Sequence, residues 1–287
     1  MNPESTPDTI ELELKIGLRD CNPTRVSTAL FEALGQSVND HTALLSNEYF
    51  DCDGLLHTHG VAIRIRSVDQ THEMTVKIRE PDEGGLSQRR EWNFPLVTPE
   101  LDYSRLEQLP LPEPITDCVQ KRKLVVVFQN TFERTDWRIV HKGCELMMSL
   151  DLGSVRVDKQ ESVVSELELE LISGDVDALV DLGCEISDRL PSYMAVISKA
   201  ERGDRLIRNA HPMQDCEPVT RCEWLHWLSR ALDPLSGPAP HEALRALNAL
   251  GYAEKSEILS EIKQGGLPHG LTRWMILESL ESKHAGG

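Results

Sequence analysis

Residues 10–18 alternate strictly between apolar and polar side chains, the pattern of a β-strand with two unlike faces. The apolar face holds Ile10, Leu12, Leu14, Ile16 and Leu18, and the charged positions between them are Glu11, Glu13 and Lys15. Because side chains two residues apart share a face, this strand aligns two carboxylates and one ammonium about 7 Å apart. Such a row either meets water or encloses a ligand.

The same period of two recurs downstream and adds charges of both signs. Strands are predicted at residues 61–67, 72–80, 88–96 and 165–172, with a pair around Gln129-Asn130 and another pair in residues 145–158. On the charged faces the bases are Lys15, Arg64, Arg66, Lys77, Arg79, Arg89 and Arg134, and the acids are Glu11, Glu13, Glu91, Asp151, Glu166, Glu168 and Glu170. A solvated sheet face accounts for one such strand, but not readily for a matched set.

An eight-stranded antiparallel barrel with its charges inside would explain both faces of these strands. Buried charges persist only when they are paired, hydrated or bound to a ligand, so the interior would suit a polyanion that carries a divalent cation. The apolar outer face then needs covering helices, which are predicted at residues 23–34, 175–190 and 194–209. The predicted fold class is α+β.

After residue 210 the pattern becomes helical and proline-punctuated, without strands. We therefore predict two parts, a barrel domain at residues 8–210 and a small all-α C-terminal region at residues 211–287. Arg202 and Arg205, near the end of the barrel domain, are interpreted as surface or barrel-closing charges. The leucine and tryptophan stripes of the C-terminal region make a homodimer possible.

Composition narrows the partners and the compartment. A net charge of -17 disfavours binding to nucleic acid or to an anionic membrane surface. Neither an apolar run long enough to span a bilayer nor a secretory signal is apparent, so a cytoplasmic location is expected. The seven cysteines are scattered without a C-x-x-C motif, which predicts reduced structural thiols and no disulfide framework.

Taken together, the ordered charges resemble the CYTH superfamily, the triphosphate tunnel metalloenzymes. The resemblance covers about residues 8–210, and within it SELELELISGD followed by ISKAERG is most similar to bacterial inorganic triphosphatases of the CYTH-CHAD kind. The residues that carry it are Glu11, Glu13, Lys15, Arg64, Arg66, Thr75, Lys77, Arg79, Arg90, Glu91, Arg134, Asp151, Glu166, Glu168, Glu170 and Lys199. The C-terminal region does not match the long, basic CHAD helices.

The resemblance implies hydrolysis of inorganic triphosphate to pyrophosphate and phosphate with Mg²⁺ or Mn²⁺. It implies catalytic roles for Glu11, Glu13, Lys15 and Lys77. The substrate-binding residues would be Lys15, Arg64, Arg66, Lys77, Arg79, Arg134 and Lys199. The metal ligands would be drawn from Glu11, Glu13, Asp151, Glu166, Glu168 and Glu170. Which carboxylate serves which ion is open, and Glu91 is equally a structural partner of the cavity arginines or a catalytic group.

Three alternatives share this resemblance. The first is an adenylyl cyclase of the CYTH type and the second a thiamine or nucleoside triphosphatase, either of which needs a site for an organic group. Aromatic residues make up only 5% of the chain and no aromatic cluster is expected beside the cavity strands, which ranks both lower. The third is a module that binds polyphosphate or nucleotide without turnover, but such a module would be expected to lack a metal-binding carboxylate.

Overall fold

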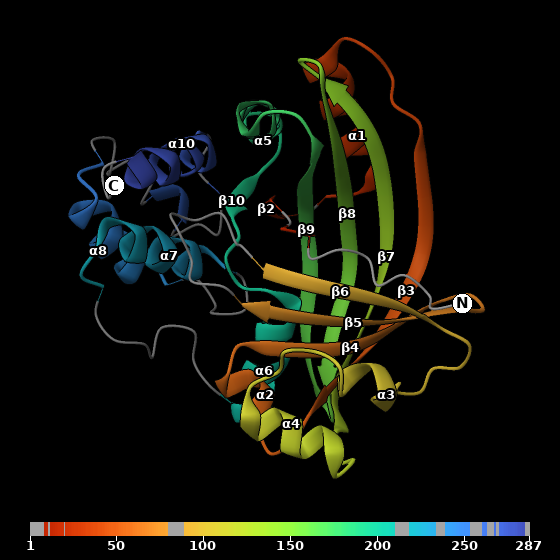
Figure 1. The fold of residues 1–287 in the computed structure, drawn as a ribbon. Helices are drawn as coiled ribbons and strands as arrows, with labels where there is room; N and C mark the ends of the chain where they lie inside the picture. Colours follow the sequence, from red (N-terminus) through yellow and green to blue (C-terminus); the bar gives the residue numbers. More distant parts are fainter. Residues whose placement is uncertain are drawn as a thin grey trace.

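The computed structural model describes residues 9–10, 12–19, 21–79, 89–209, 218–233, 239–252, 260–262, 267 and 270–284, with the backbone alone at 9–10, 79, 89 and 280–284. Ten strands of the described chain form one antiparallel sheet, in the order β1-β6-β5-β4-β3-β7-β8-β9-β2-β10. In chain order the strands are β1 (Thr9–Ile10), β2 (Glu13–Leu18), β3 (Asp40–Asp51), β4 (Val61–Val68), β5 (Thr71–Arg79), β6 (Arg89–Leu96), β7 (Val125–His141), β8 (Cys144–Val157), β9 (Gln160–Ser173) and β10 (Ser192–Met194). Strands β4, β5 and β6 run across the long strands β3, β7, β8 and β9 (Figure 1).

The antiparallel α+β fold is confirmed, but the sheet does not close as a regular eight-stranded ring. Within the described residues β1 and β10, the ends of the strand order, do not pair with each other. Instead the N-terminal segment divides between the two edges: β1 pairs with β6, and β2 pairs with β9. The N-terminal segment therefore contacts two strands, β6 and β9, through two separate short strands, whereas a closed barrel would have one continuous strand there.

Helices cover the outer, apolar face of the curved sheet. Helix α1 (Pro23–Leu34) and helix α5 (Val176–Ser187) pack on the apolar side of β2, β7, β8 and β9. Helices α2 (Leu55–Thr58), α3 (Tyr103–Leu106) and α4 (Glu113–Gln120) cover β4, β5 and β6. The first helix begins as predicted, because the Asn22 side chain accepts a hydrogen bond from the Arg25 backbone N–H at 3.0 Å.

Three predicted elements differ from the structure. The pair of strands around Gln129-Asn130 is the single strand β7, and the pair in residues 145–158 is the single strand β8. Asn130 does not turn the chain, because its buried amide oxygen accepts a hydrogen bond from Asn47 of β3 at 2.7 Å. The helix predicted from residue 194 begins only at Lys199, since Ser192–Met194 adds to the edge of β2 as β10.

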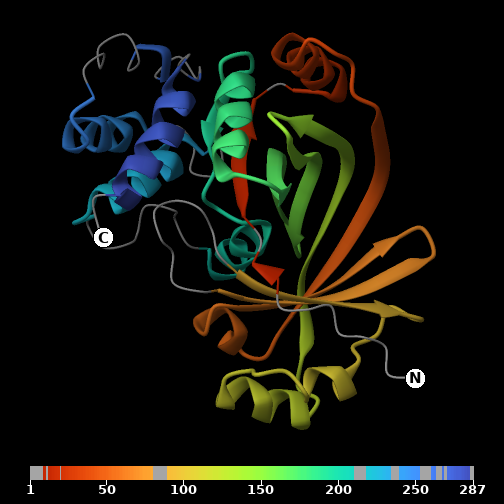
Figure 2. The same ribbon diagram turned by 45° about the horizontal axis from the view of Figure 1, so that its top comes forward.

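The C-terminal region is helical, as predicted, in its described part. Helices α7 (Arg221–Leu232), α8 (Pro240–Ala249) and α10 (Leu271–His284) lie together beside α5 (Figure 2). Their apolar cluster includes Tyr193, Met194 and Ala195 from the segment around β10. No helix in the described ranges is long and apolar enough to cross a bilayer. The division at residue 210 remains a prediction.

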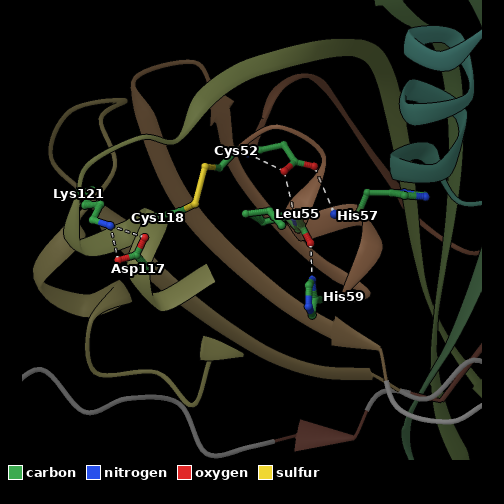
Figure 3. Close-up of a disulfide and its surroundings, with 9 residues drawn as sticks. Cys52, Leu55, His57, His59, Asp117, Cys118 and Lys121 are labelled. Carbon is green, nitrogen blue, oxygen red and sulfur yellow. Dashed lines mark hydrogen bonds and ion pairs between the residues drawn. A yellow bond between two sulfur atoms is a disulfide. The ribbon is translucent and has the colours of Figure 1, made fainter. Parts of the chain in front are cut away.

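The expectation of reduced thiols is wrong for two of the cysteines. Cys52, just after β3, is joined by a disulfide to Cys118 of α4, 66 residues further along the chain (Figure 3). Both residues belong to the apolar cluster beneath β4–β6. The sequence could not indicate this pair, because only the folding of α4 against α2 brings the two cysteines together. Cys21, Cys144, Cys184 and Cys222 are free, and Cys216 lies outside the described residues.

The disulfide makes a direct prediction for thiol counting. Protein purified without reductant and alkylated in denaturant should take up five alkyl groups, and seven after reduction. Mass spectrometry of the intact and digested protein measures the difference and identifies Cys52 and Cys118 as the protected pair. Seven groups without reduction would show that the pair is not bonded in the purified protein.

Helix α6 (Lys199–Arg208) packs against β7 at a glycine. A Cβ built on Gly203 would lie 2.5 Å from three ring atoms of Phe128, whereas a Cβ on Gly183 of α5 would meet only the flexible end of Leu14 at 2.3 Å. The first clash needs the aromatic ring or the helix to move. Gly203 is therefore the position that lets α6 approach the sheet closely.

We predict that Gly203→Ala lowers the free energy of unfolding, although alanine is intrinsically the better helix former by about 1 kcal/mol. Overpacking typically costs about 1–3 kcal/mol, so a net loss on the order of 1 kcal/mol is expected. Urea unfolding measures it, with Gly183→Ala as the matched variant that should lose less. Equal stabilisation of both variants would contradict the close approach of α6.

Candidate active site

The charged faces of the strands enclose one cavity of about 220 Å³. Strands β2, β4, β5, β7 and β9 contribute to its lining, and helix α6 covers it with Lys199. The charged side chains that line it are Glu13, Lys15, Arg64, Arg66, Glu73, Lys77, Glu91, Arg134, Glu168, Glu170 and Lys199. The alternation that places these side chains inward places the apolar ones against the helices.

One wall of the cavity is cationic. Arg64 and Arg66 share a face of β4, and the nearby Arg134 comes from β7. Arg66 Nε donates to Asn47 Oδ1 at 3.1 Å and makes no ion pair with a described residue. Burial and repulsion from Arg64 and Arg134 lower the pKa of Arg66 to about 10. A guanidinium in that environment has a strong electrostatic preference for a bound anion.

The opposite side of the cavity contains a compact, neutralised acidic cluster. Asp151, Glu166 and Glu168 offer carboxylate oxygens that lie within 4.8 Å of one another. The Lys199 ammonium contacts all three, at 2.6 Å from Asp151 Oδ2, 2.5 Å from Glu166 Oε1 and 3.0 Å from Glu168 Oε1. Arg134 adds two hydrogen bonds to Asp151 and one to Glu168, each 2.6 Å long. These carboxylates therefore already have cationic partners.

Glu168 and Lys15 stabilise each other's charged forms. Burial opposes the charge on Glu168, but Lys15, Lys199 and Arg134 lower its pKa well below the ordinary value. Lys15 Nζ lies 2.8 Å from Glu168 Oε1 and 3.8 Å from Glu13 Oε1. Burial likewise opposes the charge on Lys15, and Glu13 and Glu168 raise its pKa. Glu168 and Lys15 thus stay charged at neutral pH.

A second acidic pair is only partly neutralised, since Lys15 lies 3.8 Å from Glu13. Glu13 of β2 and Glu170 of β9 are direct partners in the sheet register, so their side chains share one face. Burial and the neighbouring Glu13 carboxylate raise the pKa of Glu170. Glu170 makes no ion pair with any residue that the structure describes. This pair is consequently short of positive charge.

The structure brings most of the predicted site residues together. Two of them cannot be placed: Glu11 lies outside the described residues, and so does the side chain of Arg79. Glu91 forms an ion pair with Lys77, and it accepts a hydrogen bond from Asn93 at 2.9 Å. Asp151 and Glu166 lie at the buried end of the cluster, with 0% and 1% exposure.

Sequence reasoning missed the contribution of β3. Asn47 orients Arg66, and Tyr49 lines the cavity and stacks on Phe128 with ring centroids 4.4 Å apart. The expectation of no aromatic cluster beside the cavity strands is therefore wrong. Asn47 and Tyr49 are two residues apart on one strand, so the same alternation that revealed the charged strands could have identified them.

Arg202 and Arg205 are not surface charges. Arg202 is 3% exposed and Arg205 is 9% exposed. Arg202 forms two hydrogen bonds with Asp233, which follows α7, and Arg205 forms two with Glu201 on its own helix. The interpretation failed for Arg202 because its partner belongs to the C-terminal region, which sequence alone does not place next to α6.

The fold is an antiparallel sheet that curves around a charged cavity, and helices cover its apolar face. Residues 9–203 match the family model described as the CYTH domain. Because the match covers more than half of the chain, this protein belongs to the CYTH family.

A named relative and two solved structures resemble this chain. An inorganic triphosphatase from Haemophilus influenzae is 29% identical over 203 residues, 67% of this chain and 54% of the relative, so the chain spans about half the length of the curated relative it matches. A Hippeastrum protein, named as an adenylyl cyclase with a dominant triphosphatase activity, has 22% identity and a TM-score of 0.46 over 68% of this chain and 96% of that one. A Pyrococcus horikoshii protein has 14% identity and a TM-score of 0.39 over 61% and 89% of the two chains.

Because Arg66 makes no ion pair with a described residue, we expect its replacement to raise stability and to weaken anion binding. Arg66→Gln should raise the unfolding free energy of the ligand-free protein on the order of 1 kcal/mol, because a buried, repelled charge is removed. It should also reduce the rise in Tm that pyrophosphate produces in EDTA. Thermal unfolding with and without pyrophosphate measures both effects.

Arg138→Gln is the matched control, since Arg138 lies on the same sheet with its side chain 67% exposed. It should alter neither quantity appreciably. If Arg66→Gln destabilised the protein and left the pyrophosphate response intact, the cationic wall would not be an anion site.

Proposed function

We propose that this protein hydrolyses inorganic triphosphate to pyrophosphate and phosphate with the help of a divalent metal ion. The observation that carries the proposal is the division of charge within one cavity. Arg66, in the cationic wall, makes no ion pair with a described residue, and Glu170, on the acidic side next to Glu13, makes none either. A metal-bound polyphosphate satisfies both needs at once, and neither a free anion nor a free cation does.

The protein's own groups have distinct roles in this proposal. Arg64, Arg66 and Arg134 hold the oxygens of the phosphate chain, and guanidinium forks suit that geometry. Lys15 and Lys77 balance charge at the acidic side of the cavity, where each already pairs with a carboxylate. Attack by water in line with the leaving pyrophosphate breaks the terminal phosphoanhydride bond, and the cavity walls orient the two groups.

The residues present fit a divalent ion. Burial and the neighbouring Glu13 carboxylate raise the pKa of Glu170, an effect that a bound cation would oppose, and the Oε2 atom of Glu166 is buried without a hydrogen-bond partner in the described chain. Glu13 and Glu170 would hold Mg²⁺ or Mn²⁺ through hard carboxylate oxygens, with Glu168 between them and the cationic wall. Such an ion neutralises phosphate oxygens and lowers the pKa of water.

Asp151 and Glu166 fit a different role in the same proposal. Both contact the Lys199 ammonium, so a metal could reach them only if Lys199 moved toward a bound phosphate. We therefore assign them first to the placement of Lys199. Glu11 remains a predicted ligand.

A second candidate substrate class is an organic triphosphate. A cavity of about 160 Å³ adjoins the charged one and shares Tyr49, Ala62, Lys77, Ser198 and Ala200 with it. Phe128 also lines this space, and its stacking on Tyr49 provides an aromatic surface. An organic group attached to the triphosphate could occupy it while the phosphates remain among the arginines.

Phosphate release from inorganic triphosphate, ATP, thiamine triphosphate, pyrophosphate and long-chain polyphosphate, each with Mg²⁺ and with Mn²⁺, tests these proposals. We predict preference for inorganic triphosphate and a fall in kcat/KM of at least about 100-fold in Glu13→Gln, because a charged ligand contact is lost. Glu133→Gln, an exposed carboxylate on the outer face of β7, is the matched control and should retain activity.

The other outcomes separate the alternatives. Preference for an organic triphosphate would support the second candidate, and cyclic AMP with pyrophosphate as products would replace hydrolysis with cyclisation. Binding of triphosphate without any phosphate release would leave a binding module and overturn the hydrolase.

A further inference from the structure

Helix α6 connects the cavity to the C-terminal helices through two basic side chains one turn apart. Lys199, its first residue, extends to the carboxylate cluster. Arg202 donates from Nη1 to Asp233 Oδ1 at 3.0 Å and from Nη2 to Asp233 Oδ2 at 2.8 Å. Asp233 is 1% exposed and caps the C-terminal end of α7. A buried, two-point contact therefore joins the cavity helix to the C-terminal region.

The same contact reaches the strand that carries Lys15. Tyr193 of β10 lies close enough to Arg202 for the two side chains to interact electrostatically, and the Tyr193 ring fills the space above Gly17 of β2. A Cβ on Gly17 would lie 2.1 Å from Cζ of that ring. Lys15 is two residues before Gly17. Arg202 thus lies between Asp233, which ends α7, and the strand that pairs with β2.

Further contacts hold β10 and α6 from the C-terminal side. Ser229 of α7 donates a short hydrogen bond to the backbone oxygen of Met194, and Thr272 of α10 donates to that of Ser192 at 2.6 Å. Arg230 of α7 lies 3.5 Å from Glu201 of α6. The segment that leads into Lys199 is consequently held on several sides by residues beyond 210.

We propose that Arg202 and Asp233 are positioning residues, which hold α6 so that the Lys199 ammonium stays among Asp151, Glu166 and Glu168. The C-terminal helices then act on the candidate active site through α6, without touching the ligand. For its kinetic readout this inference rests on the proposed triphosphatase function.

The chemistry of the pair favours positioning over simple stabilisation. A buried ion pair often contributes no more stability than apolar residues of similar size, because both charges lose their hydration. Arg202 Nε, moreover, is buried without a partner among the described residues. What the pair does supply is orientation, since a guanidinium fork on a carboxylate fixes two atoms of each group.

Displacement of α6 has a specific consequence for the cavity. If Lys199 withdrew, three buried carboxylates would lose a shared cation and would attract Lys15 and Arg134 more strongly. Those two bases would then be less available to a phosphate chain. Loss of the Arg202–Asp233 contact should therefore weaken polyanion binding and turnover together.

A double-mutant cycle between Asp233→Asn and Lys199→Gln tests this coupling. We predict that Asp233→Asn lowers kcat/KM for inorganic triphosphate about tenfold in the natural chain and less than about twofold in the Lys199→Gln background. A residue that merely stabilised the fold would reduce activity equally in both backgrounds, and that result would overturn the inference.

Asp188→Asn is the matched control. Asp188, at the end of α5, pairs with Arg273 of α10 at 2.5 Å, so it joins the C-terminal helices to the rest of the chain without involving α6. It should change kcat/KM by less than about twofold. Equal coupling of Asp188→Asn to Lys199→Gln would also overturn the proposal.

Calorimetric binding of inorganic triphosphate in EDTA separates this inference from the proposed function. If the natural chain binds triphosphate but does not hydrolyse it with metal, the hydrolase proposal fails, and the same cycle is measured on Kd. Thermal unfolding checks that each variant folds. If Asp233→Asn does not fold, Arg202→Lys takes its place, because it keeps the charge but loses the fork.

Discussion

The contact of one ammonium with three buried carboxylates is the interaction on which the arrangement of the site depends. Lys199 lies within 3.0 Å of Asp151, Glu166 and Glu168, which come from two adjacent strands and would otherwise repel one another. Isolated buried carboxylates would each cost several kcal/mol or take up protons. The ammonium shares the relief of that repulsion with Arg134 and Lys15. Arg66 makes no ion pair with a described residue and can face a ligand.

The crossing of the strands brings charges from different directions into one cavity. Strands β4 and β5 run across the long strands β3, β7, β8 and β9 (Figure 1). Some of the charges pair with their neighbours across the strands, as Lys77 does with Glu91. The curved sheet also leaves a volume in which Arg66 and Glu170, which make no ion pair with a described residue, can act on one bound molecule.

Alternation in the sequence was enough to predict the charged strands and the side of each strand that faces the cavity. It predicted which side chains of β2, β4 and β9 point into the cavity, because a shift of one residue along a strand would turn its apolar side chains inward. It failed where the deciding contact is distant in sequence. Asn130 resembles a turn residue until Asn47 donates a hydrogen bond to its amide oxygen, and Cys52 and Cys118 meet only after two helices pack. Arg202 resembles a surface base until Asp233 covers it.

The C-terminal helices share a core with the sheet, and this changes the meaning of a boundary near residue 210. The apolar cluster of α7, α8 and α10 includes Tyr193, Met194 and Ala195, which precede that boundary and adjoin β2. Ile276 of α10 belongs to the main core beneath the sheet. Movement of these helices would therefore disturb β10, and β10 leads directly into the helix that carries Lys199. The composition of the sequence changes near residue 210, but the residues before and after that point pack together and adjoin the same site.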